Sequence, residues 1–173
     1  VIIASQQQYE PFLSLITENG AETTIEERRW FAKEAFAVSS DYDAAIFNYF
    51  DAAEDSAFRY SENNAKVLRY GENPHQAAAF YKFSGGAPWG LAAAKQLGGK
   101  ELSFNNLADA TGAIGVVSEY DETAVVIVKH ANPCGVGVGK TPLEAYKAAL
   151  DCDPVSAFGG IVAFNRSVGI EEA

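Results

Sequence analysis

The chain has 173 residues, of which 48 % are hydrophobic and 12 % aromatic, so it carries enough apolar material for a packed core. Its 23 acidic and 13 basic side chains give a net charge of −10, which argues against a nucleic-acid-binding protein and against attachment to anionic lipid. No apolar run approaches the ~18 residues of a membrane span, the first residues do not resemble a signal peptide, and two cysteines cannot form a disulfide framework, so we expect a cytoplasmic protein without membrane contact.

Residues 1–64 are predicted to be helical and strongly acidic, with 12 acidic and 4 basic side chains and therefore a net charge of −8. The expected elements in chain order are the end of a strand at Val1–Ile3 and three helices, over 6–18, from Thr24 onward, and from Ser40 or Asp41 onward. Asn19-Gly20 is a typical helix stop, and Thr24 with Glu27 makes a capping box. The acidic residues most simply form solvated helix faces, and no catalytic grouping is visible in this part.

Residues 65–173 are predicted to alternate strands and helices, after a boundary in the polar stretch Ser61–Asn64. They hold 11 acidic and 9 basic side chains, a net charge of −2, and 14 of the 15 glycines. The expected elements are strands over 77–83, 124–128 and 160–164, a helix over 107–119, and a helix that begins at Thr141-Pro142. The β-branched strand at 124–128 should be buried. This order predicts an α/β sandwich with some parallel pairing.

Four polar clusters lie at the ends of these elements, at residues 69–76, 103–106, 129–135 and 153–160. In open α/β sheets, ligands bind outside the carboxyl ends of strands, which is where Lys129 and His130 follow the buried strand. Burial would lower the pKa of both groups, so that a neutral imidazole could act as general base beside an electrophilic lysine. Arg69 suits a phosphate or carboxylate through its planar fork. The plainer alternatives are a structural or solvated Lys-His pair and a surface salt bridge at Arg69.

Two similarities to known motifs do not hold. Residues 134–141 approximate a phosphate-binding P-loop, but the first position is Cys134 instead of glycine, and Thr141-Pro142 has a plainer use as a helix cap. The glycines of this segment instead suggest a tight turn close to a ligand or a neighbour. Pro133-Cys134 resembles half of a zinc deaminase site, but residue 137 is glycine instead of the second cysteine and no His-x-Glu accompanies it. We therefore expect no catalytic metal.

Taken together, the four clusters resemble a family of bifunctional purine-biosynthesis proteins. This family combines phosphoribosylaminoimidazolecarboxamide (AICAR) formyltransferase with IMP cyclohydrolase. The matching strings are residues 68–76, 99–110, 128–135 and 153–160, and the stretch 28–49 looks like the end of the cyclohydrolase domain. The resemblance implies that 1–64 is the C-terminal part of the cyclohydrolase domain and that 65–173 is the N-terminal half of the formyltransferase domain.

The same resemblance implies a fold and an assembly. The formyltransferase part would have a cytidine-deaminase-like α/β fold without its zinc, and the parent protein would be a homodimer. The family proteins are roughly three times as long as this chain, and the chain contains no methionine and begins with Val1, so we expect an internal piece of a longer protein. We expect this piece alone to be inactive, because half a domain leaves the site incomplete.

The implied reaction transfers a formyl group from the co-substrate 10-formyltetrahydrofolate to the 5-amino group of AICAR, and the other domain cyclises the product to IMP. The amine is a poor nucleophile, because its lone pair is delocalised into the ring and the carboxamide. By the matching motifs, His130 would be the general base and Lys129 would stabilise the developing charge or the leaving group. His75 would lie near the reacting groups.

The resemblance also implies substrate contacts. Arg69 and Tyr70 would contact the nucleotide, with Arg69 near its phosphate, and Asn106 and the Phe158-Gly159 turn would hold the base and the carboxamide. Two other functions stay open. One is a non-catalytic nucleotide-binding or interaction module that uses the same loops, and the other is a zinc hydrolase on a deaminase-type fold.

Overall fold

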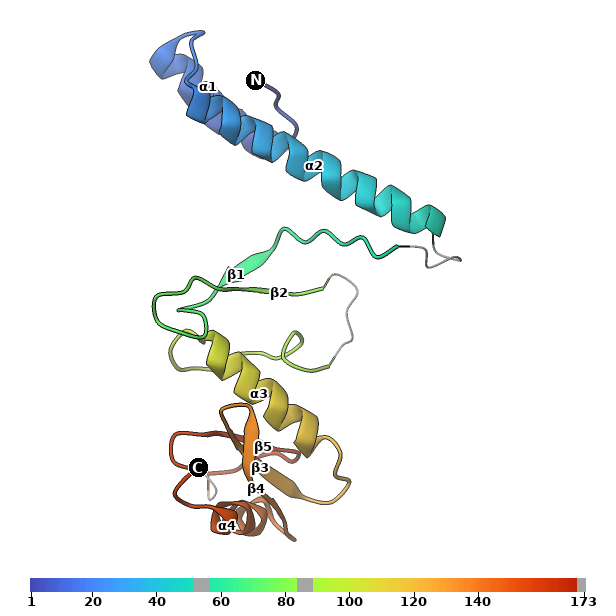
Figure 1. Cartoon of the computed structure of the whole chain (residues 1–173), viewed down its shortest axis with the longest axis vertical. Helices are drawn as coiled ribbons and strands as arrows, with labels where there is room; N and C mark the ends of the chain where they lie inside the picture. Colours follow the sequence, from blue (N-terminus) through green and yellow to red (C-terminus); the bar gives the residue numbers. More distant parts are fainter. Residues whose placement is uncertain (52–56, 84–88, 171–173) are drawn as a thin grey trace. The chain divides into compact units, whose positions relative to one another are not determined.

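The structure is a computed structural model that describes residues 1–51, 57–83 and 89–170. The chain divides into two compact units, Val1–Asn63 and Asn64–Ala173. This division lies inside the polar stretch in which the sequence places the boundary. Which enzyme domain each unit represents stays a prediction. The α-helices and strands of both units are labelled in Figure 1.

The first unit is helical. It holds a short 3-10 helix η1 (Gln6–Gln8) and the α-helices α1 (Tyr9–Asn19) and α2 (Ile25–Asp51). The predicted helix stop is confirmed, because α1 ends before Gly20, which has a φ of 66°. The predicted capping box is also confirmed. Thr24 N–H donates to Glu27 Oε2 at 2.6 Å, and Glu27 N–H donates to Thr24 Oγ1 at 3.2 Å.

Two predictions for the first unit are wrong. Val1–Ile3 is not part of a strand. The helices expected from Thr24 and from Ser40 are the single helix α2, which continues through the polar residues around Ser40. No proline or glycine interrupts residues 25–51, and Ser40 Oγ donates to the Ala37 carbonyl at 3.2 Å instead of capping a new helix.

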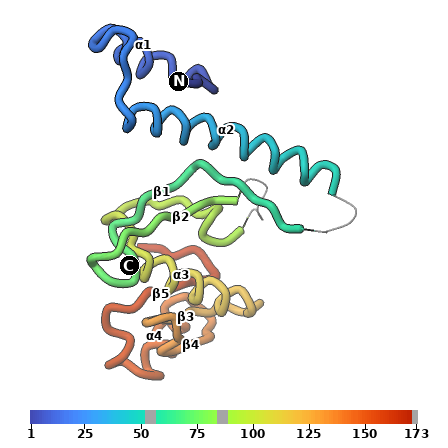
Figure 2. The backbone as a smooth tube through the Cα atoms, turned by 45° about the horizontal axis from the view of Figure 1, so that its top comes forward, coloured from blue at the N-terminus to red at the C-terminus, as the bar shows by residue number. Residues whose placement is uncertain are grey.

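The second unit has mixed α/β structure, and its described residues form two small sheets. Its elements are β1 (Ala65–Val67), β2 (Ala79–Tyr81), α3 (Phe104–Val117), β3 (Ala124–Lys129), β4 (Asn132–Val138), α4 (Pro142–Cys152) and β5 (Ile161–Phe164). Strands β1 and β2 pair with each other and run side by side in Figure 2, while the second sheet has the order β4-β3-β5. Every strand pair among the described residues is antiparallel, so the predicted parallel pairing is wrong. The hairpin from β3 to β4 reverses the chain, which puts β4 and β5 in the same direction on either side of β3.

Strand β3 forms the core of this unit, as its β-branched sequence predicts. Its first five residues are all buried. Ala124, Val126 and Val128 pack against α3, whereas Val125 and Ile127 pack against α4. Successive side chains of a strand point to opposite faces of the sheet, so β3 contacts both helices. Figure 1 shows α3 and α4 on opposite sides of this sheet. The two helices and the sheet form an α3–sheet–α4 sandwich. Lys129, the last residue of β3, lies where the strand leaves its core.

Strand β4 corrects the interpretation of the glycine-rich segment. Residues 132–138 form a strand and no loop around a phosphate, which also rules out the P-loop there. A Cβ built at Gly135 or Gly137 would overlap the backbone of α4 at Ala149 or Ala145. The glycines therefore allow helix α4 to approach the strand closely. The predicted close approach to a neighbour is confirmed, whereas the predicted tight turn is wrong. The predicted cap of α4 is confirmed, since Thr141 Oγ1 accepts a hydrogen bond from the N–H of the third helical residue.

Candidate functional site

Among the described residues, the turn between β3 and β4 holds two non-glycine residues with positive φ. Lys129 pairs with Asn132, so only His130 and Ala131 connect the two strands. Both have positive φ, 56° and 60°, which is the pattern of a type I′ hairpin turn that asparagine and glycine usually supply. Residues other than glycine cost roughly 1–3 kcal/mol each in this conformation, so it persists only where neighbouring groups hold it.

Polar contacts hold this turn from several sides. Asp109 of α3 accepts a hydrogen bond of 2.7 Å from the Ala131 N–H through Oδ1. Asn132 Nδ2 donates to the His130 carbonyl at 2.9 Å. Lys129 Nζ donates to the Phe158 carbonyl at 2.8 Å. The turn is therefore fixed both from α3 and from the segment that precedes β5, and the clusters 129–135 and 153–160 meet there.

The Lys129–His130 pair is less buried than the sequence argument requires. Lys129 is half-buried and His130 is exposed, although the rest of β3 is fully covered. The reason is that β3 leaves the core at Lys129 and the chain reverses there. The expectation of a buried pair is therefore wrong for the described chain, and what the structure supplies at this point is a fixed backbone.

The segment 153–160 is a series of turns that Asp153 stabilises. Its carboxylate accepts a hydrogen bond of 2.9 Å from the Ser156 N–H. Hydrogen bonds from the Ser156 side chain and backbone hold the pKa of Asp153 below its ordinary value. The turns leave the Phe158 side chain 85 % exposed and give Gly159 a φ of 77°. The Phe158 carbonyl thus accepts the hydrogen bond from Lys129, while its aromatic ring stays exposed.

The cluster 69–76 forms a compact loop that docks on the start of α3. Gly71 N–H donates to the Gln76 carbonyl at 2.8 Å, which closes the loop. Asn105 Nδ2 donates to the Glu72 carbonyl at 3.0 Å, although the two residues lie far apart in the sequence. The structure therefore brings this cluster against the first turn of α3, which the cluster 103–106 forms.

Arg69 and Tyr70 lie together in this loop. The Arg69 guanidinium donates to the Tyr70 hydroxyl at 3.0 Å and lies 4.7 Å from the centroid of its ring. Among the residues that the structure describes, Arg69 forms no ion pair, so the alternative of a surface salt bridge is not seen. Arg69 is itself exposed, and its planar guanidinium fork suits a phosphate or a carboxylate.

Asn106 caps helix α3. Its Oδ1 accepts hydrogen bonds from the Ser103 N–H at 3.1 Å and from Ser103 Oγ at 3.0 Å. Ser103 Oγ in turn accepts from the Asn106 N–H at 3.3 Å, which completes a capping box. The cap uses the carbonyl of the Asn106 side chain, so a contact to a ligand would come from its Nδ2 donors.

Helix α3 carries the anchors of both candidate regions. Asn105 holds the 69–76 loop, and Asp109 holds the His130–Ala131 turn. Residues four apart project from the same side of a helix, with about 5–6 Å between their Cβ atoms. The two regions therefore attach to neighbouring parts of one helix face, although no hydrogen bond among the described residues joins them directly. His75 lies exposed in the loop, and its place beside the reacting groups stays a prediction.

Sequence reasoning assigned no role to Asp109, although it lies in the matching string 99–110. It is the only charged residue of α3. A half-buried carboxylate on a helix that packs against the core normally has a specific partner, and here the partner is the Ala131 N–H. That Asp109 is the only charged residue in an otherwise uncharged helix was the sequence signal that could have identified it.

Three further features of the described residues concern metal sites, membrane-spanning helices and free cysteines. In the described part of the chain, no group of three or more His, Cys, Asp or Glu side chains could hold a metal ion. None of the described helices is long and apolar enough to cross a membrane. Cys134 is half-buried, Cys152 is exposed, and both are free thiols.

Comparison with known proteins places the chain in a family. The family described as AICARFT/IMPCHase bienzyme matches residues 1–173. The chain is 54 % identical over 165 residues to the bifunctional purine biosynthesis protein PurH of Bacteroides thetaiotaomicron, a match that covers 95 % of this chain and 31 % of that protein. It is 48 % identical over 176 residues to the PurH of Rhodospirillum rubrum, with 99 % and 33 % covered. For the PurH of Listeria monocytogenes the identity is 44 % over 176 residues, with 99 % and 34 % covered.

The chain thus spans about a third of the length of the curated relatives that it matches. The match extends over both units and over all four polar clusters. The resemblance that these clusters carry is therefore confirmed. The chain belongs to the AICARFT/IMPCHase bienzyme family.

Proposed function

We propose that this chain is part of a bifunctional purine-biosynthesis enzyme and that its second unit contributes to the AICAR formyltransferase site. The observation that carries the proposal is the β3–β4 turn, where His130 and Ala131 are held in a costly left-handed conformation. Such strain is concentrated at functional sites, where surrounding contacts over-determine the backbone. The family match and the names of the relatives give the reaction class.

The proposed reaction is formyl transfer from 10-formyltetrahydrofolate to the 5-amino group of AICAR. The amine nitrogen forms a bond to the formyl carbon, and the bond from that carbon to N10 of the folate then breaks. The amine loses one proton and the folate nitrogen gains one. His130 accepts the proton of the amine, because its exposed imidazole lies on a turn whose backbone is fixed.

Lys129 has the second role in this mechanism. Its ammonium is held at 2.8 Å from the Phe158 carbonyl, which leaves it further N–H donors for the developing formyl oxyanion or the leaving group. Arg69, which contacts Tyr70, takes the phosphate of the nucleotide. Nδ2 of Asn106 and the Phe158-Gly159 turn contact the base and the carboxamide, and His75 lies near the reacting groups.

The remaining assignments belong to the same proposal. Residues 1–64 represent the end of a cyclohydrolase domain, and 65–173 represent the first half of a cytidine-deaminase-like formyltransferase domain. The α3–sheet–α4 sandwich and the strand order β4-β3-β5 support that fold. The parent enzyme is a cytoplasmic homodimer, and residues outside this chain complete the folate site. The chain alone is inactive.

The experiment that tests the proposal uses the full-length enzyme that carries these residues. His130→Ala should abolish formyl transfer and leave cyclohydrolase activity unchanged, so the second activity is an internal control for folding. Lys147→Ala, on the exposed face of α4, is the matched control and should change neither activity. Near-normal formyl transfer by His130→Ala would refute the proposed role.

A second candidate function is a nucleotide-binding module without chemistry of its own. The observation that favours it is that the chain spans only about a third of its relatives. Calorimetry of the chain with AICAR tests for binding, and an assay with AICAR and 10-formyltetrahydrofolate tests for chemistry. Binding without turnover would support the module for this piece, and turnover would show that the distal part is not needed. No binding at millimolar AICAR would exclude the module.

A further inference from the structure

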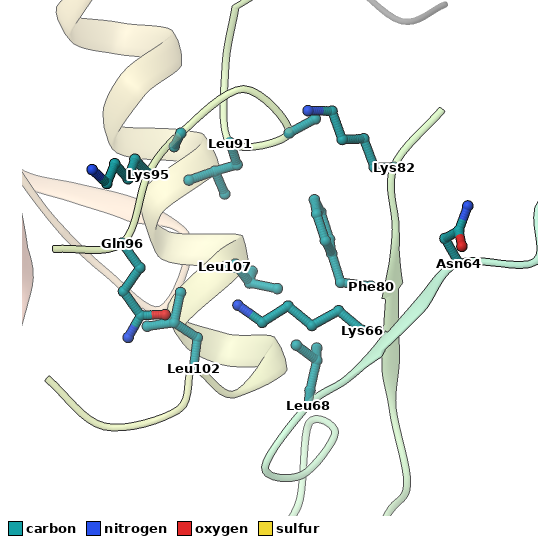
Figure 3. A pocket seen from close by; sticks show the side chains of 12 residues that line it. Asn64, Lys66, Leu68, Phe80, Lys82, Leu91, Lys95, Gln96, Leu102 and Leu107 are labelled. Atoms are coloured by element: carbon teal, nitrogen blue, oxygen red, sulfur yellow. The ribbon is translucent and has the colours of Figure 1, made fainter. Parts of the chain in front are cut away.

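A cavity of about 470 Å³ lies beside the β1–β2 hairpin, walled by the segment 91–96 and the start of α3 (Figure 3). Small-molecule sites have volumes of about 300–1,000 Å³, so this cavity is large enough for a ligand. None of the residues proposed for formyl transfer lines it. The cavity is therefore a separate candidate site in the same unit.

The cavity combines an apolar wall with cationic side chains. Lys66 on β1 pairs across the sheet with Phe80 on β2. The two-residue period of strands places Leu68 and Lys82 on the same face as this pair. In Figure 3 the Phe80 ring lies between the side chains of Lys66 and Lys82, and Leu107 of α3 lies across the cavity. This arrangement offers a flat apolar surface with an ammonium group on each side.

The charge of the lining is unlike that of the rest of the chain. Lys66, Lys82 and Lys95 are three of the nine basic residues in 65–173, and all three line the cavity. Among the described residues, no Asp or Glu lines it, and none forms an ion pair with these lysines. Three like charges in a lining without a described carboxylate create a locally positive potential, here in a chain with a net charge of −10. Such a potential selects an anion.

We propose that this cavity binds a small aromatic anion, that is, a flat apolar body that carries a phosphate or a carboxylate. The body packs on Phe80 and the leucines and loses contact with water. The anionic group accepts hydrogen bonds from Lys66 and Lys82, whose compact ammonium groups bind phosphates and carboxylates as point charges. This inference does not depend on the proposed formyl transfer, because the two sets of residues are different.

Calorimetric titration of the 173-residue chain with three probes tests the inference. The probes are 1-naphthyl phosphate, 1-naphthoate and neutral 1-naphthol, which share one aromatic body. We expect both anions to bind at least about tenfold more tightly than naphthol, since a charge-assisted hydrogen bond contributes roughly this factor. Phe80→Ala should weaken all three probes.

The double variant Lys66→Gln, Lys82→Gln should weaken both anions about tenfold or more and leave naphthol unchanged. Lys147→Gln, an exposed lysine of α4, is the matched control and should have no effect. Circular dichroism verifies that each variant is folded. The anion that binds more tightly identifies the ligand as a phosphate ester or as an aromatic carboxylate.

Three results would overturn the inference. They are equal binding of naphthol and the anions, anion binding that survives the double lysine substitution, and no binding of any probe at millimolar concentration. The double lysine variant separates this inference from the proposed function, because in the full-length enzyme it should leave formyl transfer unchanged.

Discussion

The two units of the chain differ in how much of their apolar surface they cover. In the second unit, helices cover five consecutive residues of β3 on both faces of the sheet. In the first unit, helix α2 buries Phe31, whereas Phe36 and Tyr49 remain 73 % and 78 % exposed. The comparison teaches that a regular element and an apolar side chain do not by themselves make a core. What decides the effect of a substitution is whether a second element covers the residue.

The largest expected effect comes from Phe31→Ala. Phe31 is 3 % exposed, and its ring packs edge-on against Phe12 at 5.9 Å and Trp30 at 4.7 Å between centroids. Removing a buried phenylalanine side chain costs about 3–5 kcal/mol. Phe36→Ala, on the same helix but exposed, should change the free energy of unfolding by no more than about 0.5 kcal/mol. Urea unfolding followed by circular dichroism measures the free energy of unfolding of both variants. Equal losses would contradict the claim that burial decides the effect of a substitution in α2.

A second test addresses the close approach of α4 to β4. Gly137→Ala should destabilise the second unit by about 1–3 kcal/mol, because the added Cβ would overlap the backbone at Ala145 and Ala149. Gly115→Ala in α3 is the matched control, since a Cβ there meets nothing within 4 Å. That control should stabilise by about 0.5–1 kcal/mol, as alanine is the better helix former. The same sign for both substitutions in urea unfolding would contradict the packing described here.

A third test concerns the support of the β3–β4 turn. Asp109→Ala removes the acceptor of the Ala131 N–H, and we expect hydrogen exchange of that amide to accelerate about tenfold, for a lost bond of about 1–1.5 kcal/mol. Asp109→Asn keeps an acceptor oxygen and should restore most of the protection. Asp151→Ala, an exposed carboxylate on α4, is the control. Unchanged exchange in Asp109→Ala would show that the turn does not depend on this contact.

The smallest expected effect is the pH dependence contributed by Asp153. Its folded-state pKa lies below the unfolded value, so its ionised carboxylate stabilises the folded chain above about pH 4. This contribution is lost as the pH falls through the folded-state pKa. Asp153→Asn should therefore flatten the stability curve below about pH 4. Thermal unfolding between acidic and neutral pH tests this, and identical curves for both proteins would contradict it.

Local signals predicted much of the fold. The stop at Asn19-Gly20, the box of Thr24 and Glu27, and the cap at Thr141 each depend on side chains close in sequence, and all three are confirmed. The buried strand at 124–128 was also predictable, because an unbroken β-branched run suits a strand covered on both faces.

Strand β4 and the turn before it could not be predicted in the same way. Glycine and proline disfavour strands, so Gly135 and Gly137 suggested a turn, and only their contact with α4 explains why they lie in a strand. His130-Ala131 lacks the Asn-Gly signature of a two-residue hairpin turn. For the candidate site, the clusters indicated which segments carry polar residues, whereas their contacts and the anchoring by Asp109 depend on how the chain packs.

The most direct measurement combines stability and catalysis for His130→Gly in the full-length enzyme. Glycine accepts a φ of 56° without steric cost, so the melting temperature should rise or stay the same, while formyl transfer should be lost and cyclohydrolase activity kept. That result would mean that the strained turn is maintained for the imidazole that it presents. Retained formyl transfer, or a protein destabilised by the substitution, would contradict the assignment of this turn as the centre of the site.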